Sequence, residues 1–342
     1  MIVNVPNAIA MLNAGSVVGI PTETVYGLAA RIDRPEGILK IFETKERPFF
    51  DPLIVHVSDI DQARNLALEW SPTTEALAQF FWPGPLTLVV PKNPEVSSMI
   101  TSGLETVGIR CPWHKVALEI IKATGPLAAP SANKFGRTSP TSADDVEEEF
   151  HRLVPVVDGG ASEVGVESTI LAVDGNRLRI LRPGLILPSQ IREFLKTIDE
   201  RIQLEEGDAA KAGENSPPGS AKSSVASPGN LKHHYMPAIP LVLAMKKLPR
   251  NEILEKTALA FLKLPEEVEG VHLLKPAQVR NFAELMLSQD PRIAAREVYS
   301  HLRALSRNPV DFIFLEWRPE WSSEEWSPVI DRLEKAASCI IL

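Results

Sequence analysis

Residues 17–33 read VVGIPTETVYGLAARID. The apolar run at residues 17–20 is typical of a buried strand, and Pro21 ends it. Two threonines, a glutamate and a tyrosine then crowd into the turn before GLAA. Because loops at strand ends commonly carry binding and catalytic groups, this turn is a candidate part of a site.

Short apolar segments alternate with helical patterns from this stretch to about residue 205. Strands are expected at residues 16–20, 52–57, 86–90, 106–110, 126–130, 153–158, 168–174 and 177–184. Helices are expected at residues 35–44, 59–69, 72–81, 114–124, 141–150 and 188–197. The alternation predicts an α/β or α+β domain whose site is built from loops at strand ends.

A sharp change of composition divides the chain. Residues 207–229 are rich in Ala, Ser, Pro and Gly and contain no aromatic residue, which predicts a flexible linker. We therefore expect a first domain at 1–205, a flexible linker at 206–238 and a smaller α/β domain at 239–342. In that domain the apolar segments are 239–245, 257–264, 270–275 and 310–317, and helices are expected at 277–288, 291–306 and 325–338.

Composition and charge limit the class of protein. Of the 342 residues, 44% are hydrophobic and 23% are charged, and no apolar run approaches the ~18 residues of a membrane span, so we expect a soluble globular protein. The first residues do not resemble a secretory signal. Only Cys111 and Cys339 occur, far apart, which favours the cytoplasm and gives no sign of a structural metal. A net charge of −8 argues against a protein whose main task is to neutralise nucleic-acid phosphates.

The segment ETKERPFFDPLIVHV, residues 43–57, places Lys45 and Arg47 two positions apart. Pro48 disfavours helix for Arg47, so an extended segment can aim both cations at one polyanion such as a triphosphate. The same spacing also fits a solvated charged loop, and that alternative stays open.

The segment GPLAAPSANKFGRTSPT, residues 125–141, combines small residues and prolines with uncharged donors and acceptors. Candidates for ligand contacts are Ser131, Asn133, Ser139 and Thr141. A turn followed by a helix with Ser142 as its N-cap is the structural alternative.

Further strand ends also carry polar residues. Arg110 ends a predicted strand and suits bidentate binding of a carboxylate, while Ser168 and Arg182 lie in GVESTIL and LRPG. His56, inside LIVHV, is either a core or rim histidine or a catalytic base. The sequence has no GxxxxGK[ST], GxGxxG or HExxH motif and no spacing typical of a catalytic triad. The loops together predict a site that binds and orients anions.

Taken in order, PTETVYGL, KERP with PLIVHV, FWPGPLTLVV, VGIR, APSANKFGRTSPT, GVESTI and LRPG resemble the YrdC-like domain of the threonylcarbamoyl-AMP synthases. SPGNLKHHYMP, AAREVYSHLRAL and VIDRLEKAAS resemble the long, two-domain form of that family. The resemblance implies a twisted mixed-sheet catalytic domain at 1–205 with a concave basic cavity, a linker at 206–238 that can close over the active site, and a small Rossmann-like domain at 239–342. It also implies an L-threonylcarbamoyladenylate synthase, which makes threonylcarbamoyl-AMP and pyrophosphate from L-threonine, bicarbonate or CO2, and ATP with Mg2+. A separate tRNA threonylcarbamoyl transferase would use the product to modify the adenosine beside the anticodon.

The family's site residues carry over to named positions of this chain. The resemblance places L-threonine against Thr24, His56, Arg110 and Ser168. It places ATP against Lys45, Arg47, Asp51, Thr106, Ser131, Asn133, Ser139, Arg182, His234 and Tyr235, with Lys45 and Arg47 as the catalytic pair. The rest of the opening turn, Thr22, Glu23 and Tyr26, would shape the threonine end. The resemblance implies no protein ligand for the metal, since Mg2+ arrives with ATP.

The chain departs from the family pattern at two places. Asp51 stands where relatives commonly have asparagine, which puts a carboxylate near the phosphates. Before His234 and Tyr235 the linker reads SPGNLKH, where many relatives have SPGM, a basic residue and an aromatic residue.

Two other functions are alternatives to the synthase. They are a double-stranded-RNA-binding module of the same fold and an enzyme that uses carbamoyl phosphate. The net acidity weighs against the first, although weak RNA contact stays open, and missing zinc-finger and acylphosphatase segments weigh against the second.

Overall fold

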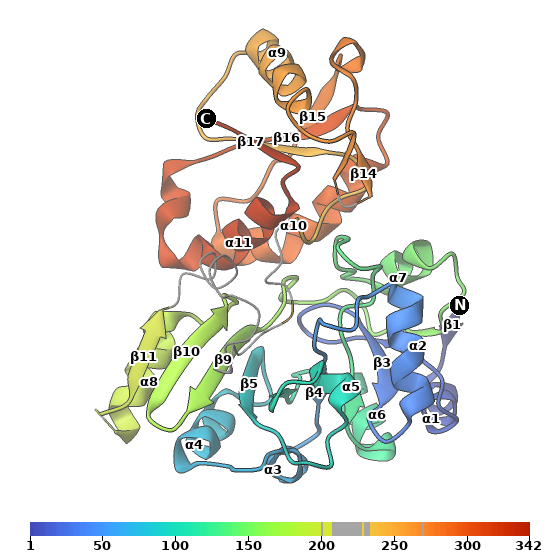
Figure 1. Ribbon diagram of the computed structural model, residues 1–342, viewed down its shortest axis with the longest axis vertical. Coiled ribbons are helices and arrows are strands. Elements are labelled where there is room, and N and C mark those ends of the chain that lie inside the picture. The colour runs from blue at the N-terminus through green and yellow to red at the C-terminus, as the bar shows by residue number, and fades with distance from the viewer. Residues whose placement is uncertain (200, 207–227, 229–232, 269) are drawn as a thin grey trace. The chain divides into compact units, whose positions relative to one another are not determined.

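The computed structural model of the chain describes residues 1–199, 201–206, 228, 233–268 and 270–342. These residues form two compact units (Figure 1). The first unit comprises Met1–Lys134 and Pro140–Asn230, and the second comprises Phe135–Ser139 and Leu231–Leu342. A five-residue segment from the middle of the chain therefore belongs to the C-terminal unit. Most of the predicted linker, residues 207–227 and 229–232, lies outside the described residues.

The described part of the first unit contains a large mixed sheet of eleven strands in the order β1-β8-β2-β3-β7-β4-β6-β5-β9-β10-β11. Its strands are β1 (Ile2–Val3), β2 (Val18–Ile20), β3 (Gly27–Arg31), β4 (Ile54–His56), β5 (Leu86–Pro91), β6 (Thr106–Arg110), β7 (Leu127–Ala128), β8 (Val156–Val157), β9 (Thr169–Asp174), β10 (Arg177–Arg182) and β11 (Gln203–Glu206). In its centre β4 pairs with β6 and β5 with β9 in parallel, whereas β5 and β6 are antiparallel.

Helices flank this sheet. They are α1 (Val5–Asn13), α2 (Pro35–Lys45), α3 (Ile60–Leu66), α4 (Pro72–Phe81), α5 (Ser98–Thr101), α6 (Lys115–Thr124), α7 (Ala143–Glu149) and α8 (Pro188–Ile198). Several begin where a short polar side chain accepts a bond from the first turn, as Asp59 does for α3 and Ser71 for α4. The six helices predicted from the sequence are present, and α1 and α5 were not predicted.

Alternation along β3 explains why helices lie on both faces of the sheet. Leu28 and Ala30 pack into the core that contains Ile41 of α2, whereas Ala29 packs with Leu12 of α1 and with α6. All of these side chains are buried. Burying one large aliphatic side chain contributes roughly 1.5–3 kcal/mol to the free energy of folding. The helices on both faces of the sheet therefore stabilise it.

The described part of the second unit contains a four-stranded parallel sheet in the order β15-β16-β12-β17. Its strands are β12 (Leu241–Ala244), β15 (Phe282–Glu284), β16 (Phe312–Glu316) and β17 (Cys339–Ile341), and its helices are α9 (Arg250–Phe261), α10 (Pro291–Ser306) and α11 (Ser327–Ala336). The strands β13 (Glu267–Val268) and β14 (Val271–His272) form a separate antiparallel pair. The chain is thus a mixed α/β protein with a second α/β unit, as the sequence predicted.

One expectation for the second unit was wrong. The segment 277–288 is not a helix, because it contains the 3-10 turn η1 (Pro276–Gln278) and the strand β15, which pairs in register with β16. Pairing with a distant strand decides between helix and strand here. The apolar segment 257–264, for which neither was predicted, falls mostly in helix α9. Within the described ranges, none of the helices is both long and apolar enough to cross a membrane.

Candidate functional site

The polar turn after β2 is buried and holds itself together. The hydroxyl of Thr22 lies 2.9 Å from that of Thr24 and donates to the carbonyl of Val25 at 2.7 Å. The amides of Thr24 and Val25 donate to Thr22 Oγ1 at 3.2 and 3.3 Å. A threonine that bonds the next residues in this way fixes a tight turn, so the Thr24 side chain has one defined position.

Arg110 meets this turn from the end of β6. It is only 4% exposed, and its Nη1 donates to Thr24 Oγ1 at 2.7 Å and its Nε to the carbonyl of Gly84 at 3.2 Å. Nη2 forms a buried ion pair with Glu23 Oε1 at 2.7 Å. Sequence reasoning gave Glu23 only a shaping role. A carboxylate in a turn expected to be buried needs a cation, and that requirement could have identified the pair.

The register of the sheet places predicted residues level with residues of neighbouring strands. His56 on β4 is level with Arg110 on β6, and Ile170 on β9 is level with both Thr87 on β5 and Arg182 on β10. Burial, with a smaller contribution from Arg110, lowers the pKa of His56 to about 3. The imidazole is therefore neutral at physiological pH.

Lys45 is the last residue of α2, and its side chain enters the protein. It is 1% exposed, and Nζ donates to the carbonyls of Ser131 and Asn133 at 2.6 and 2.5 Å. Burial, assisted by Arg47, lowers the pKa of Lys45 to about 7. Ser131 also pairs with Gly27 at the start of β3. The structure thus brings together two segments that the sequence separates by more than 80 positions.

Arg47 is buried as well, so a solvated loop is not what its segment forms. Its Nη2 lies 2.9 Å from Asp51 Oδ2 and donates to the carbonyl of Pro52 at 2.8 Å, and its Nε donates to the carbonyl of Asp51 at 3.1 Å. Burial raises the pKa of Asp51, while Arg47, Lys45 and Arg182 oppose that rise. We call Lys45, Arg47, Asp51 and Arg182 the Asp51 cluster. Glu149 and Glu167 also act on Lys45 and favour its charged form.

Arg182 is positioned by the strand beside it. Nε and Nη2 donate to the carbonyl of Ser168 at 3.2 and 3.1 Å, and Nη1 donates to the carbonyl of Pro228 at 3.2 Å. The Ser168 hydroxyl lies 2.7 Å from that of Thr87. A Cβ on Gly184 would lie 2.3 Å from the amide nitrogen of Thr169, so only glycine lets this turn pack so closely.

Thr106 lies apart from the buried cations. It begins β6, at the opposite end of that strand from Arg110. With Thr87, Pro52 and Pro228 it lines a narrow pocket of about 10 Å³. Pro52 and Pro228 accept bonds from the two arginines of the Asp51 cluster, which links this pocket to that cluster.

Segment 125–141 leads into the predicted helix cap, while its ligand contacts stay a prediction. Ser142 caps α7 in a capping box with Asp145, so the structural alternative is confirmed for the end of the segment. Asn133 is 1% exposed, and its Nδ2 donates to the carbonyl of Lys134 at 2.6 Å.

Ser139, His234 and Tyr235 belong to the second unit. Ser139 is fully buried, and the carbonyl of Tyr235 accepts a bond from Thr138 at 3.1 Å. The His234 ring packs edge-on against Phe135 and Tyr235, with ring centroids 5.7 and 4.2 Å apart. Their contact with ATP stays a prediction.

Other groups in the first unit have structural roles. The Tyr26 hydroxyl donates to the carbonyl of Gly160 at 2.7 Å and accepts from the amide of Gly159 at 3.1 Å, and burial raises its pKa to about 12. Burial also raises the pKa of Cys111 to about 12, which makes it a poor nucleophile.

Chemically, the site can hold a carboxylate at Arg110 and a polyanion at the Asp51 cluster.

Fold and site together define a mixed α/β protein whose buried basic side chains are suited to anionic substrates. The family model Sua5_yciO_yrdC, described as telomere recombination, matches residues 10–184. The model described as the C-terminal domain of threonylcarbamoyl-AMP synthase matches residues 186–338. The chain belongs to the two-domain threonylcarbamoyl-AMP synthases.

Full-length relatives agree with this assignment. The chain is 34% identical to the threonylcarbamoyl-AMP synthase of Pyrococcus abyssi over 98% of this chain and 94% of the relative. It is 36% identical to that of Bacillus subtilis over 97% and 92%. The crystal structure of P. abyssi Sua5 complexed with L-threonine matches with a TM-score of 0.80 and 31% identity, over 100% and 99% of the two chains. The predicted family, and the synthesis of threonylcarbamoyl-AMP for tRNA modification, are confirmed.

Proposed function

We propose that the first unit binds L-threonine around Thr24 and Arg110 and binds ATP at the Asp51 cluster. The Asp51 cluster is the single observation that carries this proposal. Lys45, Arg47 and Arg182 are buried together there, and burial and Arg47 disfavour the charged form of Lys45 even though Asp51, Glu149 and Glu167 favour it. A triphosphate adds negative charge that favours the charged form of Lys45, and a buried cation binds it more strongly than an exposed one does.

Threonine recognition follows from the groups around Arg110. The substrate carboxylate would share this guanidinium with Glu23, while the hydroxyls of Thr24 and Ser168 offer bonds to its polar groups. Holding the substrate by its carboxylate leaves the amine free to react. The L-threonine complex of the related P. abyssi protein supports an amino-acid site in this fold.

Mg2+ would arrive with ATP. This ion prefers phosphate oxygens, water and one or two carboxylates, and Asp51 is the carboxylate of the cluster. Among the residues that the structure describes, no group of three or more His, Cys, Asp or Glu side chains is placed to hold a metal ion. The residues present fit an ion held chiefly by its substrate. When bound, the ion neutralises phosphate charge.

The chemistry needs no nucleophilic side chain. The threonine amine combines with CO2 to form a carbamate and releases a proton, and a carbamate oxygen then attacks the α-phosphorus while pyrophosphate leaves. The chain holds the reactants together, and Lys45 and Arg47 offset the charge that develops on the phosphates. Because the pKa of His56 is about 3, this side chain is suited to positioning substrate and is a weak base.

The fold supports a wider proposal for the two units. We place the Asp51 cluster in the concave basic cavity that the family resemblance implies, and we propose that the parallel sheet of the second unit is Rossmann-like. Free Cys111 and Cys339 suit a cytoplasmic enzyme. Its product would pass to a separate tRNA-modifying transferase.

The test is to separate the two ends of the site kinetically. Pyrophosphate release is measured without RNA while ATP or L-threonine is varied, for the wild type, Lys45→Met and Thr24→Val. We expect Lys45→Met to lower kcat/KM for ATP at least about tenfold, because it removes a charge-assisted contact. Thr24→Val should lower kcat/KM chiefly for threonine.

Lys115→Met, which changes an exposed lysine, is the matched control and should leave both values unchanged. If Lys45→Met and Thr24→Val changed kcat/KM equally for ATP and for L-threonine, the assignment of separate ATP and threonine ends of the site would be contradicted. Substrate-independent pyrophosphate release by the wild type would contradict the proposed reaction.

A further inference from the structure

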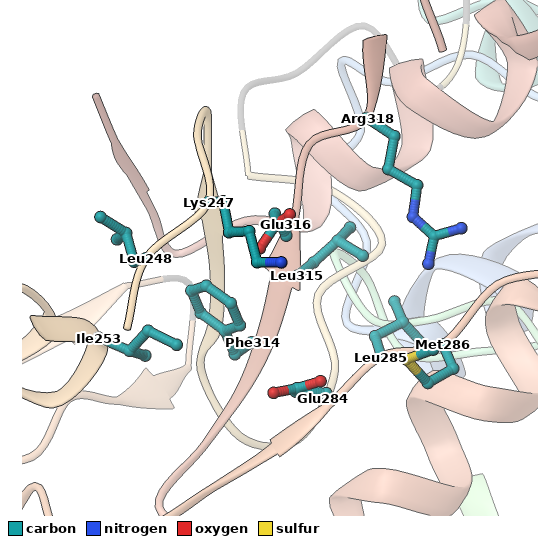
Figure 2. Close-up of a pocket in the computed structure, with 10 residues that line it drawn as sticks. All are labelled: Lys247, Leu248, Ile253, Glu284, Leu285, Met286, Phe314, Leu315, Glu316 and Arg318. Carbon is teal, nitrogen blue, oxygen red and sulfur yellow. The ribbon is translucent and has the colours of Figure 1, made fainter. Parts of the chain in front are cut away.

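The second unit contains a pocket of about 290 Å³ that the site described above does not use (Figure 2). It lies where β12, β15 and β16 end, since its walls include Lys247 after β12, Glu284 at the end of β15 and Glu316 at the end of β16. These three strands are parallel, so their carboxyl ends share one edge of the sheet.

The topology of the sheet makes this edge a natural binding position. After β12 the chain continues into α9, which packs against β17. After β16 it continues to α11, which packs against α10. Helix α9 lies on one side of the sheet and α10 and α11 lie on the other (Figure 1). Neighbouring strands β16 and β12 therefore send their connections to opposite faces. Open α/β sheets commonly bind ligands at such a point, outside the carboxyl ends of the strands.

Four charged side chains line the pocket, two of each sign. They are Lys247, Arg318, Glu284 and Glu316 (Figure 2). Glu316 and Arg318 are half-buried, and Lys247 and Glu284 are exposed. No side-chain hydrogen bond or ion pair joins Lys247, Glu284 or Glu316 to any other described residue. The Arg318 guanidinium lies 5.7 Å from the Trp321 ring centroid and makes no ion pair within the described chain.

The rest of the wall is apolar. Phe314, Leu248, Ile253 and Leu285 are each at least nine-tenths buried and present carbon to the pocket. A pocket with an apolar floor and a few convergent polar groups is typical of small-molecule sites, and this one has the volume of a small metabolite site.

We propose that this pocket binds a zwitterion of the size of a free α-amino acid. The ligand carboxylate would contact Arg318 and Lys247, its ammonium would contact Glu284 and Glu316, and its side chain would lie against Phe314. The two cations and two carboxylates cancel, so a simple anion such as phosphate would meet two repelling glutamates. A ligand with both charges satisfies all four groups. This site goes beyond the proposed function, because it lies wholly in the second unit.

Methyl NMR of the full chain tests the proposal. Met286 lines the pocket, and it is one of only six methionines in the sequence. With 13C-labelled methionine methyl groups, L-leucine or L-threonine at up to about 20 mM should shift the Met286 resonance saturably. Leucinamide, N-acetyl-L-leucine and inorganic phosphate each lack one of the two charges and should bind at least about tenfold more weakly.

Variants locate the binding. Arg318→Gln and Glu284→Gln should each weaken binding of the amino acid at least about fivefold, since each removes one charged contact. Lys246→Gln, which changes an exposed neighbour that does not line the pocket, should leave binding unchanged. The resonances of the other methionines report whether each variant is folded. An unmoved Met286 with both amino acids, an equal response to phosphate, or an unchanged response in both variants would overturn the proposal.

Discussion

Binding of ATP to this enzyme should take up a proton at Lys45. In the free protein, burial together with the charge of Arg47 lowers the pKa of this lysine to about 7. A triphosphate beside the ammonium favours its charged form and raises the pKa toward the ordinary value of 10.5. At pH 8 about one tenth of the free protein carries the proton, whereas nearly all of the complex does, so binding should take up about 0.9 proton.

Calorimetry measures this uptake directly. ATP binding at pH 8 is titrated in two buffers with different ionisation enthalpies, and the difference in observed enthalpy gives the number of protons taken up. At pH 6, where Lys45 is already charged, the uptake should be close to zero. Lys45→Arg, which keeps a permanent cation, is the matched control and should show no uptake at pH 8. The reasoning would be refuted by uptake below about 0.2 proton in the wild type, or by equal uptake in the variant.

Three further predictions concern stability, each measured by urea unfolding. The pKa of His56 in the folded chain is about 3, below its ordinary 6.5, so the unfolded chain takes up this proton first and stability is lost between pH 6.5 and about 3. Between pH 7 and pH 5 the free energy of unfolding of His56→Asn should therefore fall by about 2 kcal/mol less than that of the wild type. Equal falls in the two proteins would contradict this. Glu23→Gln leaves Arg110 buried without its ion pair and should cost about 3 kcal/mol; a loss below 1 kcal/mol would be too small for this explanation. Gly184→Ala should lower the free energy of unfolding by at least about 2 kcal/mol, because the new Cβ would lie 2.3 Å from the backbone nitrogen of Thr169. Gly108→Ala should lower it less, because the atom nearest to its new Cβ, on Thr87, is 3.4 Å away.

The sequence predicts local structure well where the pattern is local. Helix α4 (Pro72–Phe81) lies within its predicted bounds, because a serine cap, a proline in the first turn and an apolar stripe all agree. Residues 277–288 had no such agreement, and pairing of Phe282 with Phe312 made part of the segment a strand. Helix α1 (Val5–Asn13) was missed although Asn4 caps it and Pro6 lies in its first turn, so a usable signal was present.

For the site, the sequence supplied the residues but not their partners. The motif resemblance selected Lys45 and Arg110, yet nothing local indicates that Lys45 donates to the carbonyls of Ser131 and Asn133. The ion pair between Arg110 and Glu23 joins positions far apart in the chain. Such contacts depend on the order of strands in the sheet, which the hydrophobic pattern does not determine.

The most direct test of the account follows the carbon atom of bicarbonate. Wild-type enzyme is incubated with ATP, Mg2+, L-threonine and 13C-bicarbonate, and the adenylate product is analysed by mass spectrometry beside the pyrophosphate released. The account predicts one labelled carbon in each threonylcarbamoyl-AMP and one pyrophosphate per product. It also predicts that both fall at least about tenfold in Lys45→Met at limiting ATP and stay unchanged in Lys115→Met. Pyrophosphate release without labelled adenylate, or full activity of Lys45→Met, would contradict it.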